Sequence, residues 1–127
     1  MENIEINQNL STPYFPSVKF EVSSGVCEIS GESYMEEAYK FYLPLINWIR
    51  QFTEEEKRKI TLNIKLIYFN TSTSKCLLDI FEILKKYKEQ GGQTEVNWFY
   101  DEDDPDMVEE VRDFENEAEM EFNIKAF

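Results

Sequence analysis

The fold of this 127-residue chain is decided by the segment Ile60-Thr-Leu-Asn-Ile-Lys-Leu-Ile-Tyr-Phe69, which runs directly into Asn70-Thr-Ser-Thr-Ser-Lys75. In the first stretch an apolar side chain stands at every second position, which predicts a strand with one fully apolar face. These apolar side chains belong to Ile60, Leu62, Ile64, Leu66 and Tyr68. The second stretch holds four consecutive hydroxyl residues, 71–74, where the pattern changes from strand to helix. Together the two stretches predict a strand, a polar turn and a helix.

The segments on either side of this unit have equally clear patterns. After the turn, apolar residues recur at helical spacing as far as Tyr87, and Gln90-Gly91-Gly92 follows as a typical helix end. On the N-terminal side, 18–22 and 26–30 alternate like the two strands of a hairpin around a Ser-Ser-Gly turn.

Residues 33–52 predict the first helix of the chain. Ser33-Tyr-Met-Glu36 has the form of a capping box, in which two reciprocal hydrogen bonds satisfy helix N-terminal donors. Pro44 lacks an N–H group and clashes with the preceding turn, so we expect either a kink there or a helix that restarts at this residue. Thr53-Glu-Glu-Glu56 offers a second capping box.

The C-terminal third predicts one more strand at 96–100, a helix within the acidic segment 101–121, and a last strand at 122–127. In that helix an N-cap is expected from the Asp-Asp-Pro-Asp run, and Met107, Val108, Val111 and Phe114 supply a narrow apolar stripe. Residues 1–16 read as an extended arm. The alternation of strands and helices predicts a single α/β domain over 1–127, with a mixed sheet of four to five strands and about three helices mainly on one face.

The composition excludes several classes of function. Histidine is absent, which removes the commonest general base and zinc ligand, so we expect neither an enzyme nor a metal or other cofactor. The formal net charge of −13 makes nucleic acid and anionic membranes poor partners. No apolar run is long enough to span a bilayer, and the start is unlike a signal peptide. We therefore expect a cytoplasmic protein, with Cys27 and Cys76 as buried free thiols.

The acidic charge is concentrated in 101–121, where twelve acids stand against one base, Arg112. Three interpretations are open: a solvated helix face, electrostatic matching to a basic partner, or a divalent-ion site. The last is the weakest, since Asp101, Asp103 and Asp104 lack the glycine and the ligand spacing of a calcium loop.

The hydroxyl run 71–74 also has two interpretations. It could only cap the second helix, with Ser72 or Thr73 as the N-cap residue, for about 1 kcal/mol. It could instead be a phosphorylation site, because the N–H groups and dipole of a helix N-terminus stabilise an anion. Lys75 would then either position the phosphate or remain solvated. Leu78 and Phe81 are candidates for partner contact or for simple packing.

Several motifs resemble the SiaC-like regulatory phosphoproteins, which are bacterial partner-switching proteins with a fold like that of anti-sigma-factor antagonists (STAS domains). The resemblance extends over nearly the whole chain. The most specific motif is 66–75, Leu-Ile-Tyr-Phe-Asn-Thr-Ser-Thr-Ser-Lys. Weaker motifs are Ser11-Thr12-Pro13, Gly31-Glu32-Ser33-Tyr34 and Ile46-Asn-Trp-Ile49.

This resemblance implies that the threonine after the asparagine, here Thr71, is phosphorylated, with Ser72 and Thr73 as secondary candidates. It implies a cognate Ser/Thr protein kinase, a PP2C-type phosphatase, and a diguanylate cyclase regulated by the unphosphorylated form, hence c-di-GMP signalling and biofilm regulation. The expected partner-binding residues are Asn70, Thr71, Ser72, Ser74, Lys75, Leu78 and Phe81.

We therefore expect a non-catalytic signalling adaptor that is switched at Thr71. The alternative hypothesis is a constitutive acidic scaffold or inhibitor that binds a basic partner surface through 101–121 and has no switch.

Overall fold

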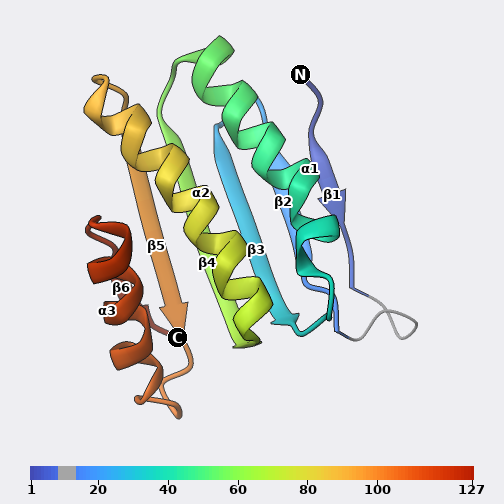
Figure 1. Cartoon of the computed structure of the whole chain (residues 1–127), viewed down its shortest axis with the longest axis vertical. Coiled ribbons are helices and arrows are strands. Elements are labelled where there is room, and N and C mark those ends of the chain that lie inside the picture. The colour runs from blue at the N-terminus through green and yellow to red at the C-terminus, as the bar shows by residue number, and fades with distance from the viewer. Residues whose placement is uncertain (9–13) are drawn as a thin grey trace.

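The computed structural model describes residues 1–8 and 14–127 (Figure 1). In chain order its elements are β1 (Ile4–Ile6), β2 (Ser17–Glu21), β3 (Val26–Ser33), α1 (Ala38–Gln51), η1 (Phe52–Glu56), β4 (Ile60–Phe69), α2 (Thr71–Glu89), β5 (Thr94–Tyr100), α3 (Met107–Ala118) and β6 (Asn123–Ala126). The Ser11-Thr12-Pro13 motif lies outside the described residues.

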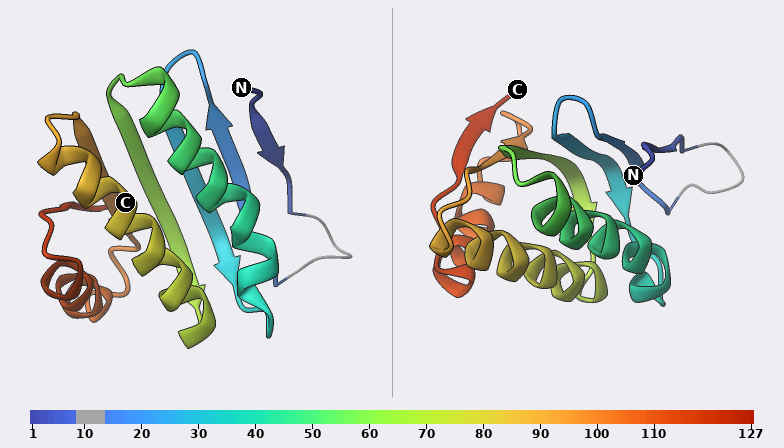
Figure 2. Two further views of the ribbon diagram at one scale, coloured as in Figure 1. Left: turned by 45° about the horizontal axis from the view of Figure 1, so that its top comes forward. Right: turned by 90° about the horizontal axis from the view of Figure 1, so that it is seen from above.

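The strands form one sheet in the order β1-β2-β3-β4-β5-β6. The first two pairings are antiparallel and the other three are parallel. Parallel neighbours need a crossover, and α1, α2 and α3 supply the three crossovers in turn. Figure 2 shows these helices on the same face of the sheet. The predicted α/β class with a mixed sheet is therefore confirmed.

The sheet has six strands rather than the four to five that we predicted. The additional strand is β1, which lies within the predicted arm and pairs with β2 through Ile4 and Phe20. The indole N–H of Trp48 on α1 also donates to the Glu2 carbonyl at 2.8 Å. Part of the arm is thus an edge strand that contacts the helix layer.

The hydrophobic core lies between the sheet and the helices. The first four apolar positions of β4 are at most 1% exposed, as the alternation predicts; they are Ile60, Leu62, Ile64 and Leu66. Trp48 and Trp98 are buried, as predicted. At the α3 side the Trp98 ring lies 5.3 Å from the Phe114 ring, so α3 joins the core through an aromatic contact.

The alternation fails at the end of β4. Gly31 of β3 pairs with Leu66, but Glu32 pairs with Tyr68, so Ile67 is the extra residue of a β-bulge. The prediction that Tyr68 continues the buried face is wrong, because the bulge turns its side chain outward and leaves it 54% exposed. Phe69 then points back toward the core, with its ring 5.8 Å from that of Trp98.

The predicted capping box of the first helix is also wrong. Ser33 is the last residue of β3, and α1 begins at Ala38 after Glu37, which makes no side-chain capping bond. The strand keeps Ser33 because its hydroxyl is buried in a polar network described below. The helix is continuous through Pro44, so the predicted restart does not occur.

The second predicted capping box, at residues 53–56, is replaced by the π-helical turn η1. The Thr53 hydroxyl donates back to the Arg50 carbonyl at 2.9 Å instead of capping a new helix. Lys57 then ends the turn in the left-handed conformation, with φ 52°.

The acidic segment contains α3, which buries three of the four predicted stripe residues, Met107, Val111 and Phe114, and leaves Val108 half-buried. Asp106 occupies the N-cap position but makes no side-chain capping bond. In the described part of the chain, no helix is both long and apolar enough to cross a membrane. Cys27 and Cys76 are buried and free, which confirms the expectation for both thiols.

Candidate functional site

The candidate site is the turn between β4 and α2, and Asn70 forms its centre. Asn70 has an extended backbone, and its side-chain oxygen accepts a hydrogen bond from the Thr73 N–H at 2.9 Å. Asparagine is among the best N-cap residues because it satisfies such a donor. The prediction that Ser72 or Thr73 caps α2 is therefore wrong, although the identity of residue 70 was enough to indicate it.

Thr71 is the first residue of α2 and its side chain is exposed. Ser72 is half-buried, and its hydroxyl donates to the Glu36 carbonyl at a long 3.4 Å. The Ser74 hydroxyl donates to the Asn70 carbonyl at 3.2 Å, while Lys75 is exposed. Of the four consecutive hydroxyl residues, Thr71 is thus the one whose side chain is exposed to solvent.

Thr73 has the opposite environment, with no exposed surface. Its hydroxyl oxygen lies 2.7 Å from the Ser33 hydroxyl and donates to the Ser33 carbonyl at 3.0 Å. The Ser33 hydroxyl in turn lies 2.9 Å from the Tyr42 hydroxyl. The structure speaks against Thr73 as a phosphate acceptor, because a kinase cannot reach this hydroxyl without opening the turn.

This buried network is uncharged. Burial raises the pKa of Tyr42 well above its ordinary value, against the smaller opposing effect of the Ser33 hydrogen bond. The phenol therefore stays protonated and can act as donor or acceptor to Ser33. Sequence reasoning missed this network, because Ser33 and Thr73 lie forty residues apart in the chain.

Two further hydrogen bonds tie the turn to the segment after β3. The Asn70 backbone N–H donates to the Ser33 carbonyl at 3.2 Å, and the Asn70 side-chain amide donates to the Met35 carbonyl at 2.9 Å. Both sides of Thr71 are therefore anchored to residues 33–36. The exposed hydroxyl therefore lies on a turn that is hydrogen-bonded to the end of β3 and the segment after it.

The two apolar residues proposed for partner contact differ in accessibility. Phe81 is fully buried, and its ring lies 4.8 Å from the Phe122 ring, so the structure contradicts a direct partner contact by Phe81. Leu78 is half-buried and packs against the core cluster, which leaves part of its side chain accessible.

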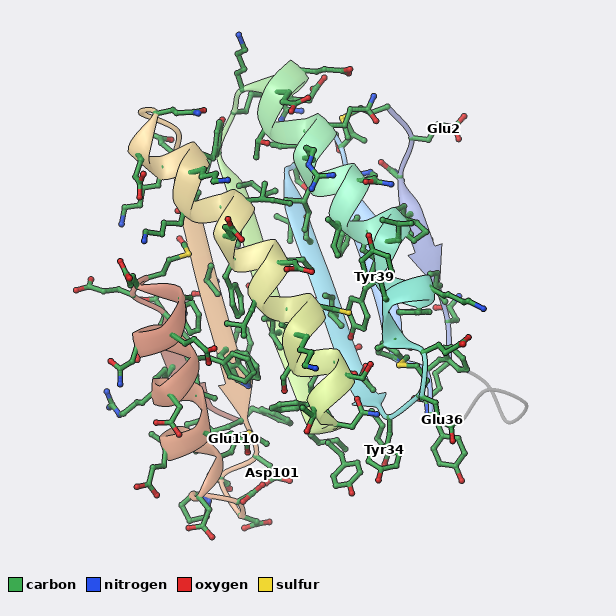
Figure 3. All side chains as sticks on the ribbon, in the orientation of Figure 1. Glu2, Tyr34, Glu36, Tyr39, Asp101 and Glu110 are labelled. Carbon is green, nitrogen blue, oxygen red and sulfur yellow. The ribbon has the colours of Figure 1, made fainter. Side chains whose placement is uncertain are left out.

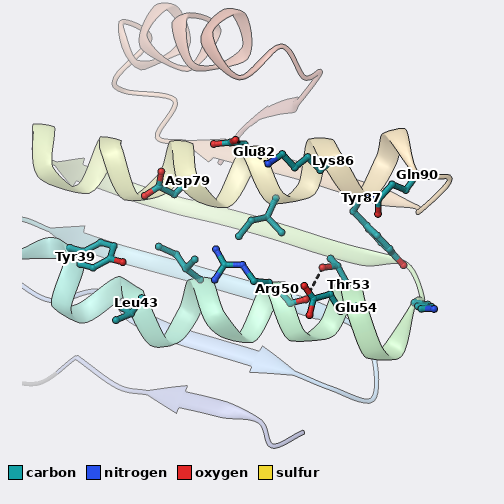
Figure 4. Close-up of a pocket in the computed structure, with 13 residues that line it drawn as sticks. Tyr39, Leu43, Arg50, Thr53, Glu54, Asp79, Glu82, Lys86, Tyr87 and Gln90 are labelled. Atoms are coloured by element: carbon teal, nitrogen blue, oxygen red, sulfur yellow. Dashed lines mark hydrogen bonds and ion pairs between the residues drawn. The ribbon is translucent and has the colours of Figure 1, made fainter.

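A groove of about 720 Å³ separates α1 and α2 on the side away from the sheet (Figure 4). Its lining mixes exposed Tyr39 and Leu43 with charges of both signs, such as Arg50 and Glu82. Within the described part of the chain, no cluster of Cys, Asp or Glu side chains could hold a metal ion. The groove is thus a surface feature of mixed apolar and charged lining between the two helices.

A mixed sheet covered by helices on one face, with an exposed threonine at a capped helix start, defines a small α/β protein with a candidate regulatory turn. The family model for "SiaC family regulatory phosphoprotein" matches residues 9–127, so the chain belongs to the SiaC family.

Solved structures agree with this assignment, and a curated protein is also similar in sequence. The crystal structure of apo-SiaC from Pseudomonas aeruginosa superimposes with a TM-score of 0.90 at 25% identity, covering 99% of this chain and 100% of that one. A chain in the crystal structure of the diguanylate cyclase SiaD in complex with its activator SiaC, also from P. aeruginosa, gives 0.90 at 25% identity, covering 98% and 99%. An uncharacterized protein of P. aeruginosa (strain UCBPP-PA14) is 27% identical over 126 residues, which are 99% of this chain and 98% of the relative.

Proposed function

We propose that this protein is a non-catalytic signalling adaptor, switched by reversible phosphorylation of Thr71 in the cytoplasm. The observation that carries the proposal is the exposed position of Thr71 as the first residue of α2, beside three hydroxyl residues that are wholly or partly buried. A cognate Ser/Thr kinase would add the phosphate and a PP2C-type phosphatase would remove it.

The fold can carry a phosphate at this position. Phosphorylation adds about −1.5 to −2 charge at neutral pH. The first N–H groups of an α-helix have no intrahelical acceptor, and the helix dipole also favours negative charge there. The Asn70 side chain satisfies the N–H of Thr73, and the Asn70 carbonyl satisfies that of Ser74. The modified α2 should therefore stay folded while the surface around Thr71 changes its charge.

The partner of the unphosphorylated form is proposed to be a diguanylate cyclase, so that the output is c-di-GMP synthesis. The support is a relative of the same fold and family, which forms a complex with the diguanylate cyclase SiaD as its activator. A partner that contacts the Thr71 turn would have to desolvate the phosphate, which is costly unless it supplies a matching cation.

The test combines mass spectrometry with binding. Protein purified from its native cells should contain a fraction that is heavier by one phosphate, mapped to Thr71. Thr71→Glu should weaken binding of the source organism's partner diguanylate cyclase by at least about tenfold. Thr71→Gln is the control, because glutamine has the size of glutamate without its charge, and it should bind like wild type. Thr71→Ala should bind and resist modification, and Ser72→Ala should remain modifiable.

An unmodified mass under all growth conditions, together with equal affinity of the Glu and Gln variants, would contradict the switch. If binding instead disappears when acids within 101–121 are neutralised, the constitutive acidic scaffold is the correct function.

A further inference from the structure

Two tyrosines stand exposed together where β3 and β4 end. Tyr34 directly follows β3 and is 47% exposed, and Tyr68 is the next-to-last residue of β4 and is 54% exposed. Their ring centroids are 5.1 Å apart with an interplanar angle of 32°. The two rings are therefore in contact with each other.

The bulge in β4 is the reason that this pair exists. With regular alternation after Leu66, Tyr68 would face the helices; the extra residue Ile67 reverses its direction. Ile67 itself is 48% exposed. β-Bulges next to functional sites commonly re-aim side chains in this way. We define Tyr34, Ile67 and Tyr68 as the tyrosine patch.

The tyrosine patch adjoins the turn that holds Thr71. Tyr68 precedes Thr71 by three residues, and Tyr34 lies between two residues, Ser33 and Met35, whose carbonyls accept hydrogen bonds from Asn70. Figure 3 shows Tyr34 at the end of the molecule where α2 begins. A partner that covers the patch must therefore also lie against the Thr71 turn.

The border of this end of the molecule is acidic. Glu32 pairs with Tyr68 across the strands, and Glu36 follows the patch along the chain. Asp101 opens the acidic segment at the same end (Figure 3). The nearby Lys40 already pairs with Glu37 at 2.8 Å. The patch therefore presents an apolar centre with carboxylates along its border, while Lys75 in the first turn of α2 is an exposed cation at the same end.

We propose that the tyrosine patch is the docking surface for the diguanylate cyclase, an inference that rests on the proposed function. Its occupant is a cyclase surface with apolar side chains at the centre and Lys or Arg side chains at the rim, which match the carboxylates of Glu32, Glu36 and Asp101. Complementary rim charge speeds encounter, and the apolar centre provides the affinity.

Tyrosine suits this role for two physical reasons. It offers a large contact area with few rotatable bonds, so little conformational entropy is lost on binding, and its hydroxyl can stay hydrated at the edge of the contact. Large exposed apolar groups that gather at one place also mark interaction sites more often than isolated ones do.

The same arrangement explains how a phosphate on Thr71 releases the cyclase. A phosphate at the edge of the apolar centre would have to lose water when the partner covers it. Exposed Lys75, in the same first turn of α2, carries one positive charge and so offsets only part of the phosphate's charge of about −1.5 to −2, which leaves a net opposition to binding.

The test is titration calorimetry of the source organism's partner cyclase against matched variants. Tyr34→Ala and Tyr68→Ala should each weaken binding by at least about tenfold, as expected at interface hot spots. Tyr68→Phe should stay within about threefold of wild type. Tyr39→Ala is the matched control, since Tyr39 is 56% exposed but lines the groove between α1 and α2; it should bind normally. Urea unfolding of each variant verifies that the fold is intact.

The outcomes separate this inference from the proposed function. If both alanine variants bind within twofold of wild type while Thr71→Glu binds weakly, the tyrosine patch is not the docking surface and the switch stands. Equal losses for Tyr39→Ala also overturn the patch. If the alanine variants lose affinity but Thr71→Glu does not, the docking surface stands and the switch fails. A wild-type protein that binds no cyclase overturns both.

Discussion

Thr71 and Thr73 lie two residues apart on the first turn of α2 and have opposite environments. The Thr71 side chain is exposed, whereas Thr73 is fully buried and bonded to Ser33. With 3.6 residues per helical turn, positions two apart point to nearly opposite sides of a helix. Because α2 lies on the sheet, one side of its first turn faces solvent and the other faces the end of β3.

Because of this difference, two threonines with the same side-chain chemistry have different structural roles. The inner side, with Thr73, Ser33 and Tyr42, fixes the position of the helix start. The outer side, with Thr71, is free to change its charge. Under the proposed switch, a turn that had to rearrange its own support at each phosphorylation would lose stability with each change of state. The separation of the two sides would avoid this loss.

The largest expected difference comes from placing the same carboxylate on each side. Thr73→Glu forces a charge into a site without a cation and should lower the free energy of unfolding by about 3–5 kcal/mol. Thr71→Glu should change it by no more than about 0.5 kcal/mol. Urea unfolding measures both. Similar losses for the two variants would show that the outer side also supports the fold.

Removal of the hydroxyl groups should give a smaller difference of the same sign. Thr73→Val keeps the shape but leaves the Ser33 carbonyl without this donor, so it should cost about 1–3 kcal/mol of unfolding free energy. Thr71→Val, at an exposed position, should stay within about 0.5 kcal/mol of wild type. A thermal or urea melt of the pair is sufficient, and a neutral Thr73→Val would contradict a structural role for the buried hydroxyl.

The Asn70 side chain makes two hydrogen bonds at the start of α2, and substitutions can separate their contributions to stability. Asn70→Ala loses both the acceptor for Thr73 N–H and the donor to Met35, and should cost about 1–2 kcal/mol. Asn70→Asp keeps the acceptor alone and should recover about half of that loss. If Asn70→Asp is as unstable as Asn70→Ala, the bond to Met35 carries the whole effect.

The smallest expected effect is a pKa change of the Glu95 carboxylate, which lies near the start of β5, far from the turn. A hydrogen bond from Asn97, and next the ammonium of Lys59, lower the pKa of Glu95 below its ordinary 4.5. The lowered pKa means that this contribution to stability is present above pH 4.5 and is lost as the pH falls through the folded-state pKa. NMR titration should show a higher Glu95 pKa in Lys59→Met and no change in the control Lys88→Met.

Much of the fold could be predicted because local patterns and packing agree. The alternation from Ile60 to Leu66 and the helical spacing up to Tyr87 both survive in β4 and α2. The predictions failed mainly at helix starts and at the end of β4. Ser33 resembles a capping residue in sequence, but its hydroxyl has a better partner in the core, in Thr73.

The sequence located the candidate site, but we did not predict which of its hydroxyl residues are exposed and which are buried. The asparagine and the four hydroxyl residues mark a strand-to-helix turn. The helical spacing of Cys76, Leu77 and Ile80, extended back by one turn, places residue 73 on the apolar face and residue 71 off it, but the hydrogen-bond partner of Thr73 on β3 leaves no local mark in the sequence. The tyrosine patch was invisible for a related reason: a bulge is a property of two paired strands, and the pattern of β4 alone predicts a buried Tyr68.

The sequence by itself determined the order of strands and helices from β2 onward, the acidic charge of 101–121 and the place of the hydroxyl-rich turn, because these depend on periodicity and composition. Only the tertiary structure decided that Thr71 faces solvent, that Thr73 is sealed against Ser33, and that Tyr68 turns outward beside Tyr34. The physical reason is that exposure and hydrogen-bond partners are set by contacts between β3, β4 and the helices, which join residues distant in the chain.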